Sequence, residues 1–500
     1  MNHWIIAPVV LPAVLGAATV LAGSLSHSPS LHRTWPRAIT LLGSLALLGV
    51  ALLLLAQASA GPPQVYRLGD WPAPFGIVLV LDRLSALMLV LTAILGVIGL
   101  MQVIATGADR RGAHFHALWL FQLMGLNGAF LTGDAFNLFV FFEVMLIASY
   151  GLMVHGAGGE RLRAGLHYVA VNLVGSSLFL IALAMVYGVT GTLNMADLAV
   201  KVPALPEGDF ALIRVAAVLM VMVFALKGAL VPLQFWLPGT YAHAPGVVAA
   251  LFAVLTKVGV YAAIRAGTLM FPAEAPAIGP ILTDLLWPAA LVTLLLGAAA
   301  VPGARTLARL AAFAAMSSTG LAFVAVAGFA AEGLTAGLYY VIHSTLASAL
   351  LFLIADLCIL RGAERLDGST PRLPGRLAVL FFASAIASAG LPPLSGFLGK
   401  LLILEAGIDE AALLYPVVLG GSFLLVVGFA RAGSALFWRA GGELAPPLPA
   451  RTYLAPAALV LLMAALTIWA GPVTGWLAET AAAVTDPAAY ITANALETLP

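Results

Sequence analysis

Long, continuously apolar stretches alternate with short polar segments along the whole chain. Each stretch holds about 20 residues, which is enough for an α-helix to cross the hydrocarbon core of a bilayer. Strands of a membrane barrel would instead alternate apolar and polar residues over about ten positions. The pattern therefore predicts an all-α polytopic membrane protein. Its fourteen expected transmembrane helices cover about residues 5–23, 38–57, 77–105, 115–132, 135–154, 166–189, 211–236, 246–270, 279–301, 306–328, 334–360, 376–404, 412–438 and 452–471.

The distribution of basic residues supports this division into helices. Fifteen arginines fall in the loops after odd-numbered helices, whereas Arg67, Lys201, Arg214 and Arg265 lie in or beside the even-numbered loops. Loops rich in arginine and lysine remain in the cytoplasm. We therefore expect the odd-numbered loops on the cytoplasmic side and both termini on the outer side. The loop after the seventh helix carries no charge and does not contribute to this assignment.

Composition narrows the class further. The 500 residues are 62% hydrophobic and 9% charged, against about 25% charged residues in ordinary soluble domains. The net charge of +1 gives no indication of a nucleic-acid partner. The single cysteine, Cys358, cannot form an internal disulfide, and no Cys/His cluster has the spacing of a metal or iron–sulfur site. We therefore expect no metal, cofactor or catalytic residue. The N-terminus lacks the basic segment of a cleaved signal and is expected to form the first helix.

Five titratable residues interrupt the apolar helices near the middle of the membrane. They are Glu143 in FNLFVFFEVMLIASY, Lys227 in VFALKGALV, Lys257 in VLTKVGVYA, His343 in LYYVIHSTLASALLFL and Lys400 in GFLGKLLIL. A charge at this depth costs a few kcal/mol and usually indicates a functional site. Because no segment supplies its own counter-charge, we expect partners from neighbouring helices.

Lysine predominates inside the membrane, whereas arginine predominates in the loops. Burial shifts the pKa of lysine readily, whereas arginine stays charged. A row of groups that gain and lose protons at one depth is what a proton path requires. An interhelical salt bridge that only stabilises the bundle is an alternative for Glu143 with Lys227. It explains the whole set less well, because one acid cannot neutralise three lysines and a histidine.

Prolines are expected to break the seventh and twelfth helices near these lysines. Pro232 follows Lys227 by five residues, and Pro392 and Pro393 precede Lys400. Broken helices in corresponding positions of two halves indicate inverted repeats in transporters. We therefore expect two inverted five-helix repeats, helices 4–8 and 9–13. The resulting segments are 1–110 (helices 1–3), 115–270 (first repeat), 279–438 (second repeat) and 439–500 (helix 14 and a C-terminal tail).

Several other polar residues have weaker signals. Ser317, Ser318 and Thr319 either bond backbone carbonyls and bend the tenth helix or hold water in a proton path. Asp356 and Glu405 are near helix ends and are expected at the membrane interface, as are His114 and His116, which flank a helix start. His243 is expected in a loop or at a helix end.

Three segments together carry a family resemblance: GDAFNLFVFFEVMLIASYGLM, FWLPGTYAHAPGVVAALFAVLTKVGVYAAIR and SAGLPPLSGFLGKLLIL. They resemble the antiporter-like subunits shared by respiratory complex I and the Mrp-type multisubunit cation/proton antiporters, and most closely the D-type subunits of the Mrp (also called Pha) antiporters. The resemblance covers nearly the whole chain. It implies a fourteen-helix fold with two inverted five-helix repeats.

The resemblance also implies roles for the interior residues. Glu143 and Lys227 would form a pair coupled to a central Lys257, and Lys400 would end the proton path. Many relatives carry a lysine five residues after the histidine of the eleventh helix, where this chain has Ser348. The second half-channel is therefore expected to depend on His343 together with water and nearby hydroxyls: Ser344, Thr345 and Ser348.

These observations predict a proton-translocating subunit of a Na⁺(K⁺)/H⁺ antiporter in a bacterial inner membrane. It would be a transporter subunit rather than an enzyme and would work with sister subunits of an Mrp complex. One alternative is a proton-pumping subunit of complex I or of a membrane-bound hydrogenase, and a second is a membrane scaffold that conducts nothing.

Overall fold

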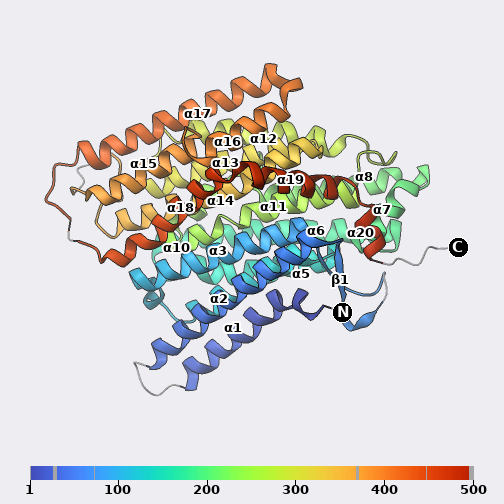
Figure 1. Ribbon diagram of the computed structural model, residues 1–500, viewed down its shortest axis with the longest axis horizontal. Coiled ribbons are helices and arrows are strands. Elements are labelled where there is room, and N and C mark those ends of the chain that lie inside the picture. Colours follow the sequence, from blue (N-terminus) through green and yellow to red (C-terminus); the bar gives the residue numbers. More distant parts are fainter. Residues whose placement is uncertain (1, 26–30, 72–73, 368–370, 446, 495–500) are drawn as a thin grey trace.

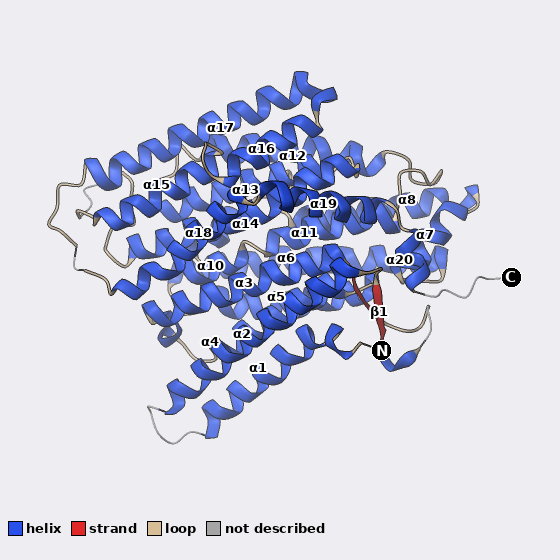
Figure 2. Cartoon of the chain, in the orientation of Figure 1, coloured by secondary structure: helices blue, strands red, loops and turns tan. Residues whose placement is uncertain are grey.

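The computed structural model describes residues 2–25, 31–71, 74–367, 371–445 and 447–494. Nearly all of these residues are helical, and the long helices run roughly side by side in one bundle (Figure 1, Figure 2). In this described part, eleven helices are long and apolar enough to cross a membrane, and three shorter apolar helices accompany them. The expected all-α polytopic class is therefore confirmed.

The helices follow the expected order of spans along the chain. Spans one to six correspond to α1 (Ala7–Leu25), α2 (Leu31–Ala60), α3 (Arg83–Thr106), α4 (Phe115–Leu131), α5 (Ala135–Met153) and α6 (Gly159–Thr190). Spans seven to eleven correspond to α8 (Phe210–Lys227) with α9 (Trp236–His243), α10 (Gly246–Phe252) with α11 (Leu255–Arg265), α12 (Ile281–Ala300), α13 (Leu307–Val326) and α14 (Ala331–Ile359). Spans twelve to fourteen correspond to α15 (Gly375–Ala389) with α16 (Ser395–Ala406), α17 (Ala411–Gly433) and α18 (Leu454–Ile468).

The remaining elements are short or terminal. They are α7 (Met195–Lys201), α19 (Ala470–Thr485), α20 (Ala488–Ala493), the strands β1 (Gln64–Arg67) and β2 (Val78–Leu81), the π-helices Ala266–Met270 and Ser434–Trp438, and the 3₁₀ turns His3–Ile5, Leu68–Asp70, Ala108–Arg111, Val202–Ala204, Glu207–Asp209, Ile408–Glu410 and Ala450–Tyr453.

The expected start of the third span, at residue 77, is wrong. Residues Val78–Leu81 form strand β2, which pairs antiparallel with β1 in the register Gln64↔Leu81. The run VLVL is apolar enough for a membrane helix, but its β-branched valines also favour a strand. Asp82 then caps α3, because its side chain accepts the N–H of Ser85 at 2.8 Å.

Three spans are interrupted, one more than expected. The backbone leaves the helix between α8 and α9, around Pro232, and between α15 and α16, around Pro392 and Pro393. The eighth span was expected to be continuous, but it is divided between α10 and α11 at Ala253–Val254. The sequence around this break contains neither proline nor glycine, so it gave no signal of the interruption.

The C-terminal part extends further as helix than expected. The fourteenth span ends near residue 469, and α19 continues to Thr485 before the short α20. Both α18 and α19 pack against α14, and Figure 1 shows them crossing the front of the bundle. The contact with α14 explains why this apolar segment stays ordered beyond the span.

Two central elements are apolar all round and buried by their neighbours. In α14 nearly every residue from Leu334 to Cys358 is buried, and in the segment Gly246–Met270 almost all are. A helix that is hydrophobic on all sides belongs inside a bundle. These two elements carry His343 and Lys257, so both groups lie far from the lipid.

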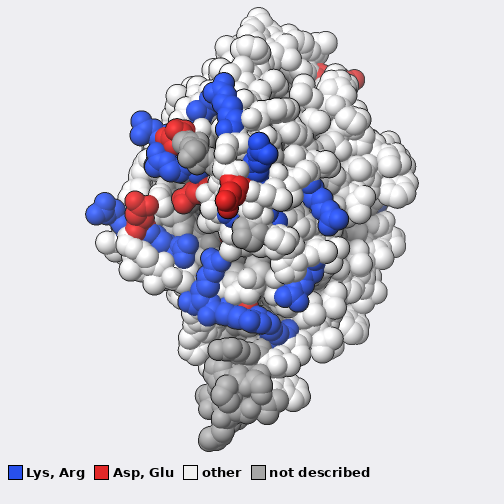
Figure 3. All heavy atoms as spheres, turned by 90° about the vertical axis from the view of Figure 1, so that its left-hand side faces the viewer, with Lys and Arg blue, Asp and Glu red and all other residues white. Residues whose placement is uncertain are grey.

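Hydrogen bonds join the odd-numbered loops at one end of the bundle. Leu366 N donates to Arg305 O at 2.8 Å, which links the loops after the eleventh and ninth spans. Arg161 Nε donates to His243 O at 2.8 Å, so the uncharged loop after the seventh span lies at this same end. Figure 3 faces this end of the molecule, where arginine side chains gather.

The even-numbered loops meet at the opposite end. Arg265, at the end of α11, forms a 2.7 Å ion pair with Asp82 at the start of α3. The guanidinium also lies over the ring of Tyr490 in α20, 5.4 Å from its centre. The C-terminal helix α20 is thereby attached to the end that also holds the β1–β2 hairpin (Figure 1).

Candidate functional site

Glu143 lies at the edge of the bundle rather than at its centre. Its side chain is half-buried, and the residues one turn before and after it, Val140 and Ile147, are 38% and 66% exposed. The carboxylate accepts a hydrogen bond from Ser176 Oγ of α6. As expected, its partner comes from a neighbouring helix.

Lys227 is the last residue of α8, directly before the break. It is 5% exposed, and its Nζ donates to Asn172 Oδ1 of α6 at 3.0 Å. The ammonium also lies 5.7 Å from the ring centre of Phe142. Of the ion pairs found among the described residues, none joins Lys227 to Glu143 within 4.0 Å. The two groups instead share α6 as a common neighbour.

The backbone groups freed by the α8–α9 break have partners inside the protein. Val231 N donates to Thr293 Oγ1 of α12 at 2.8 Å. Trp236 Nε1 donates to Leu226 O at 2.9 Å. Irregular backbone is tolerated at membrane depth only when its polar groups are satisfied in this way. The break is therefore a stable feature that leaves Lys227 at a helix C-terminus, where a positive charge is favoured.

Lys257 is 1% exposed and is the third residue of α11, after the second break. Its Nζ donates to Thr319 Oγ1 of α13 at 3.4 Å, a long hydrogen bond. Two residues later, Gly259 packs on the end of α8: a Cβ at Gly259 would lie 2.6 Å from Gly228 N. The start of α11, which carries Lys257, and the end of α8, which carries Lys227, therefore touch.

His343 of α14 and Lys400 of α16 both contact the break in the twelfth span. His343 is 1% exposed, and its Nδ1 is 2.9 Å from Ser395 Oγ, the first residue of α16. Lys400 Nζ donates to Ala389 O, the last residue of α15, and to Ser422 Oγ of α17, both at 2.7 Å. The carbonyl released at the helix break thus becomes an acceptor for the lysine.

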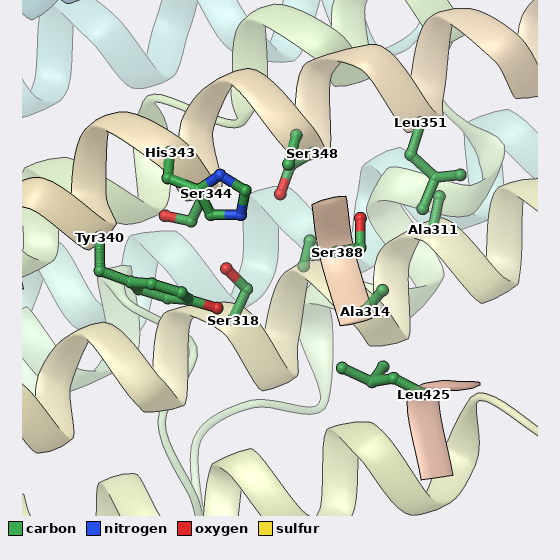
Figure 4. A pocket seen from close by; sticks show the side chains of 12 residues that line it. Ala311, Ala314, Ser318, Tyr340, His343, Ser344, Ser348, Leu351, Ser388 and Leu425 are labelled. Atoms are coloured by element: carbon green, nitrogen blue, oxygen red, sulfur yellow. The ribbon is translucent and has the colours of Figure 1, made fainter. Parts of the chain in front are cut away.

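Two small cavities lie between these groups, each of about 10 Å³. That volume holds about one water molecule. Figure 4 shows the first, where His343, Tyr340 and several hydroxyls face a common space. Its polar lining is Ser318, Tyr340, His343, Ser344, Ser348 and Ser388. The second cavity is lined by Tyr340 and Lys400 together with Ser317 and Ser422.

Ser348, expected to contribute to the second half-channel, therefore opens onto a polar space. Thr345 does not: its hydroxyl donates to Val341 O of its own helix at 2.6 Å. Ser344 lines the cavity but also donates to Val341 O, at 3.3 Å. Among these hydroxyls, Ser348 is thus better suited than Thr345 to contact a water.

Three consecutive hydroxyls of α13 face three different parts of the site. Ser317 lines the cavity beside Lys400, Ser318 lines the cavity beside His343, and Thr319 accepts from Lys257. Successive helix residues point about 100° apart, so one turn of α13 can place a hydroxyl beside each of Lys400, His343 and Lys257. The sequence left the role of these hydroxyls open, whereas the fold makes α13 the element between the two halves of the site.

Several residues of the site were missed in the sequence. Asn172 and Ser176 stand four positions apart in the apolar sixth span, and this spacing was an available signal. Ser388 likewise follows Ser384 by four positions, whereas Ser422 is an isolated serine that nothing in the local sequence distinguishes from others.

Asp356, expected at the membrane interface because it is near a helix end, is covered by protein. It is 5% exposed, and its Oδ2 has no hydrogen-bond partner among the described residues. The reason is the close approach of α10: a Cβ at Gly246 would lie 2.4 Å from Asp356 Cβ. The N-terminus of α10 therefore covers a helix end that would otherwise meet water or lipid headgroups.

Two acids outside the spans have shifted pKa values. Burial alone would raise the pKa of Asp109, but hydrogen bonds from His116 and Arg37 and their positive charges hold it below its usual range. Burial raises the pKa of Asp134, the N-cap of α5, to about 6, although the backbone N–H of Asn137 partly opposes this shift.

Comparison with known proteins identifies the family to which the chain belongs. The family model described as "NADH:quinone oxidoreductase/Mrp antiporter, TM" matches residues 132–425, more than half of the chain. This region contains all five interior titratable groups. The chain therefore belongs to this family of multi-span membrane proteins, and the resemblance seen in its motifs is confirmed.

Two similar sequences have names that specify a branch of this family, the D-type subunits of antiporters. The chain is 40% identical to the D-type subunit of a "Probable K(+)/H(+) antiporter" of Rhizobium meliloti, over 82% of this chain and 80% of that protein. It is 36% identical to the D-type subunit of a "Na(+)/H(+) antiporter" of Bacillus subtilis, over 92% of each.

Solved structures share the fold. A chain of the Mrp complex from Dietzia sp. DQ12-45-1b superposes with a TM-score of 0.89 at 28% identity, covering 99% of this chain and 100% of that chain. A chain of respiratory complex I from Thermus thermophilus gives a TM-score of 0.82 at 27% identity, covering 96% and 99%.

Proposed function

We propose that the chain is the D-type subunit of a multisubunit monovalent cation/proton antiporter and that it conducts protons through the middle of the membrane. The proton path runs from Glu143 through Lys227, Lys257 and His343 to Lys400. The main support for this path is that its three lysines are buried and donate hydrogen bonds to neutral oxygens. These acceptors are Asn172 Oδ1, Thr319 Oγ1, Ala389 O and Ser422 Oγ.

Neutral partners suit a relay better than carboxylates do. A buried lysine paired directly with an acid is held charged, because breaking such a pair costs about 3–5 kcal/mol. An amide, hydroxyl or carbonyl oxygen accepts a hydrogen bond from –NH₃⁺ and from –NH₂ alike. Each lysine can therefore lose and regain its proton without leaving an orphaned counter-charge.

The hydroxyls and water-sized cavities around α13 supply the links between these groups. Lys257 releases its proton toward the Thr319 hydroxyl of α13. A water in the cavity lined by Ser318, Ser348 and His343 then continues the path. The second cavity, bounded by Ser317, carries it to Lys400. In this proposal a hydroxyl-lined water at Ser348 replaces the lysine of relatives.

The names of the relatives indicate the overall reaction. Protons moving inward would be exchanged for Na⁺ or K⁺ moving outward, and the chain would act together with the other subunits of an Mrp-type complex. The arginine-rich end would face the cytoplasm and both termini the outside of a bacterial inner membrane. The broken pairs α8–α9 and α15–α16 would mark two inverted five-helix repeats, segments 115–270 and 279–438.

A proton-pumping subunit of a redox complex is the second candidate, supported by the fold shared with a complex I chain. The higher sequence identity to the D-type antiporter subunits favours the first. The two differ in whether transport needs an electron donor.

The test is antiport in everted vesicles that carry the whole complex, with Na⁺ and K⁺ compared and no respiratory substrate added. Lys257→Ala is expected to abolish cation-induced proton release from the vesicles while the complex still assembles. Lys257→Arg should also assemble and be inactive, because arginine does not release its proton. The matched control is Lys201→Ala, which removes the one lysine outside the row, at the surface beside Asp197. Full activity of Lys257→Ala would overturn the relay.

A further inference from the structure

One turn of α6 contacts both ends of the first charged pair. Asn172 Oδ1 accepts from Lys227 Nζ at 3.0 Å, and Ser176 Oγ donates to the carboxylate of Glu143. The two α6 residues are four positions apart and share a helix face. They are 1% and 7% exposed, so both are inside the bundle although Glu143 lies at its edge.

We propose that Asn172 and Ser176 are positioning residues that hold Glu143 and Lys227 apart and so prevent them from closing into a fixed salt bridge. The inference rests on the proposed proton relay and assigns to α6 a role that the five interior charges do not include. Neither residue gains or loses a charge itself. Each one fixes where a titrating neighbour lies.

The chemistry of the two side chains fits the two groups they contact. Lysine only donates hydrogen bonds when charged, and the amide oxygen of Asn172 only accepts them. A carboxylate only accepts, whereas a carboxylic acid also donates, and the hydroxyl of Ser176 can do either. The α6 turn therefore remains bonded to both neighbours whichever of them carries the proton.

The side chain of Asn172 is itself held in place. Its Nδ2 donates to Tyr168 O, one turn earlier in α6, at 2.9 Å, which directs Oδ1 toward Lys227. The ring of Phe142 lies beneath the ammonium and contributes a cation–π contact. The contact with Asn172 holds the amine on α6, and the Phe142 ring contacts it from α5.

The charge of Glu143 acts on both Lys227 and Tyr150. If Asn172 were lost, the lysine would lose its hydrogen-bond acceptor on α6 while the attraction of the Glu143 carboxylate remained.

The experiment measures antiport by the whole complex in everted vesicles across pH 6–9, with assembly checked on a native gel. Asn172→Leu removes the acceptor at similar size. We expect the maximal rate to fall roughly tenfold, the cation concentration for half-maximal rate to stay the same, and the pH optimum to rise. The optimum rises because a lysine held against a carboxylate releases its proton only at higher pH.

Ser176 provides the second arm of the test. Ser176→Ala should slow transport, and Ser176→Thr, which keeps the hydroxyl, should restore most of the rate. The matched control is Ser177→Ala, since Ser177 is exposed and its hydroxyl donates to Leu173 O of its own helix. That control should match the wild type in rate and pH optimum.

Asn172→Asp is a second variant in case Asn172→Leu fails to fold, because aspartate has nearly the same shape as asparagine. It places a second acid against Lys227 and should fix the charged lysine, with a loss of rate at least as large as that of Asn172→Leu. If the Asn172 and Ser176 variants behave like Ser177→Ala while Lys257→Ala is inactive, the positioning role is wrong and the relay stands. If Lys257→Ala is also active, the relay itself fails.

Discussion

Lys400 lies in a space that only a glycine at position 390 leaves open. A Cβ at Gly390 would come within 2.5 Å of Lys400 Cδ and 2.9 Å of its Nζ. Gly390 is the C-cap of α15 with φ of +76°, so it both ends the helix and turns the chain toward α16. Gly390 therefore determines both the break between α15 and α16 and the position of Lys400.

Gly390→Ala is expected to displace Lys400 from Ala389 O and Ser422 and to reduce antiport severely in the assembled complex. The positive φ alone costs alanine about 1–2 kcal/mol, so a backbone effect must be separated from the clash. Gly362→Ala provides this control, because Gly362 also has a positive φ of +72° but no atom within 4 Å of the added Cβ. Antiport and assembly should be measured for both variants. Equal effects would show that backbone strain, and not the displaced lysine, is responsible.

Thr319→Val should slow transport without disturbing the fold. Valine has nearly the shape of threonine but lacks the hydroxyl that accepts from Lys257. We expect a loss of roughly tenfold or more in the maximal rate of cation-induced proton movement, since each tenfold corresponds to about 1.4 kcal/mol in the barrier. Thr335→Val is the control, because the Thr335 hydroxyl donates to Ala331 O of its own helix, near the start of α14. A Thr319→Val complex with the wild-type rate would remove Thr319 from the path.

Ser348 tests whether a water replaces the lysine found in relatives. Ser348→Ala keeps the cavity but removes one polar wall, and should lower the rate partially. Ser348→Leu fills a space that holds about one water and should abolish transport while the complex still assembles. Equal rates for wild type and Ser348→Leu, measured in the same vesicles, would place the proton path elsewhere.

The raised pKa of Asp134 predicts that the stability of the folded protein depends on pH. Its pKa is raised to about 6 in the folded chain, against about 3.9 when unfolded. The folded state therefore binds more protons between pH 4 and pH 6, and the contribution of Asp134 to stability falls as pH rises through this window and stays low above it. The loss is at most about 3 kcal/mol, from about 1.4 kcal/mol for each pKa unit.

Asp134→Asn keeps an N-cap residue and removes the charge. The midpoint of thermal unfolding of the purified complex should therefore rise at pH 8 and change little at pH 4. Asp486→Asn is a suitable control, since Asp486 also bonds a backbone N–H, of Ala488, but is exposed. A shift of the same size at both pH values would contradict the assigned burial effect.

The order of spans and the interior charges followed from the sequence alone, for a physical reason. A bilayer demands apolar stretches of a set length and penalises every charge within them, so the exceptions are visible in one dimension. Glu143, Lys227, Lys257, His343 and Lys400 could be selected because each breaks that rule. The prolines at the seventh and twelfth spans were visible for a similar reason.

Only the tertiary structure decided what those charges meet. Asn172, Ser176 and Ser422 are small polar residues that a membrane helix tolerates anywhere, and contacts across helices make them partners of the charges. The break before Lys257 and the burial of Asp356 likewise arise from close approach of other elements. Which side chains share a space depends on how helices distant in sequence pack, and one-dimensional hydropathy does not contain that information.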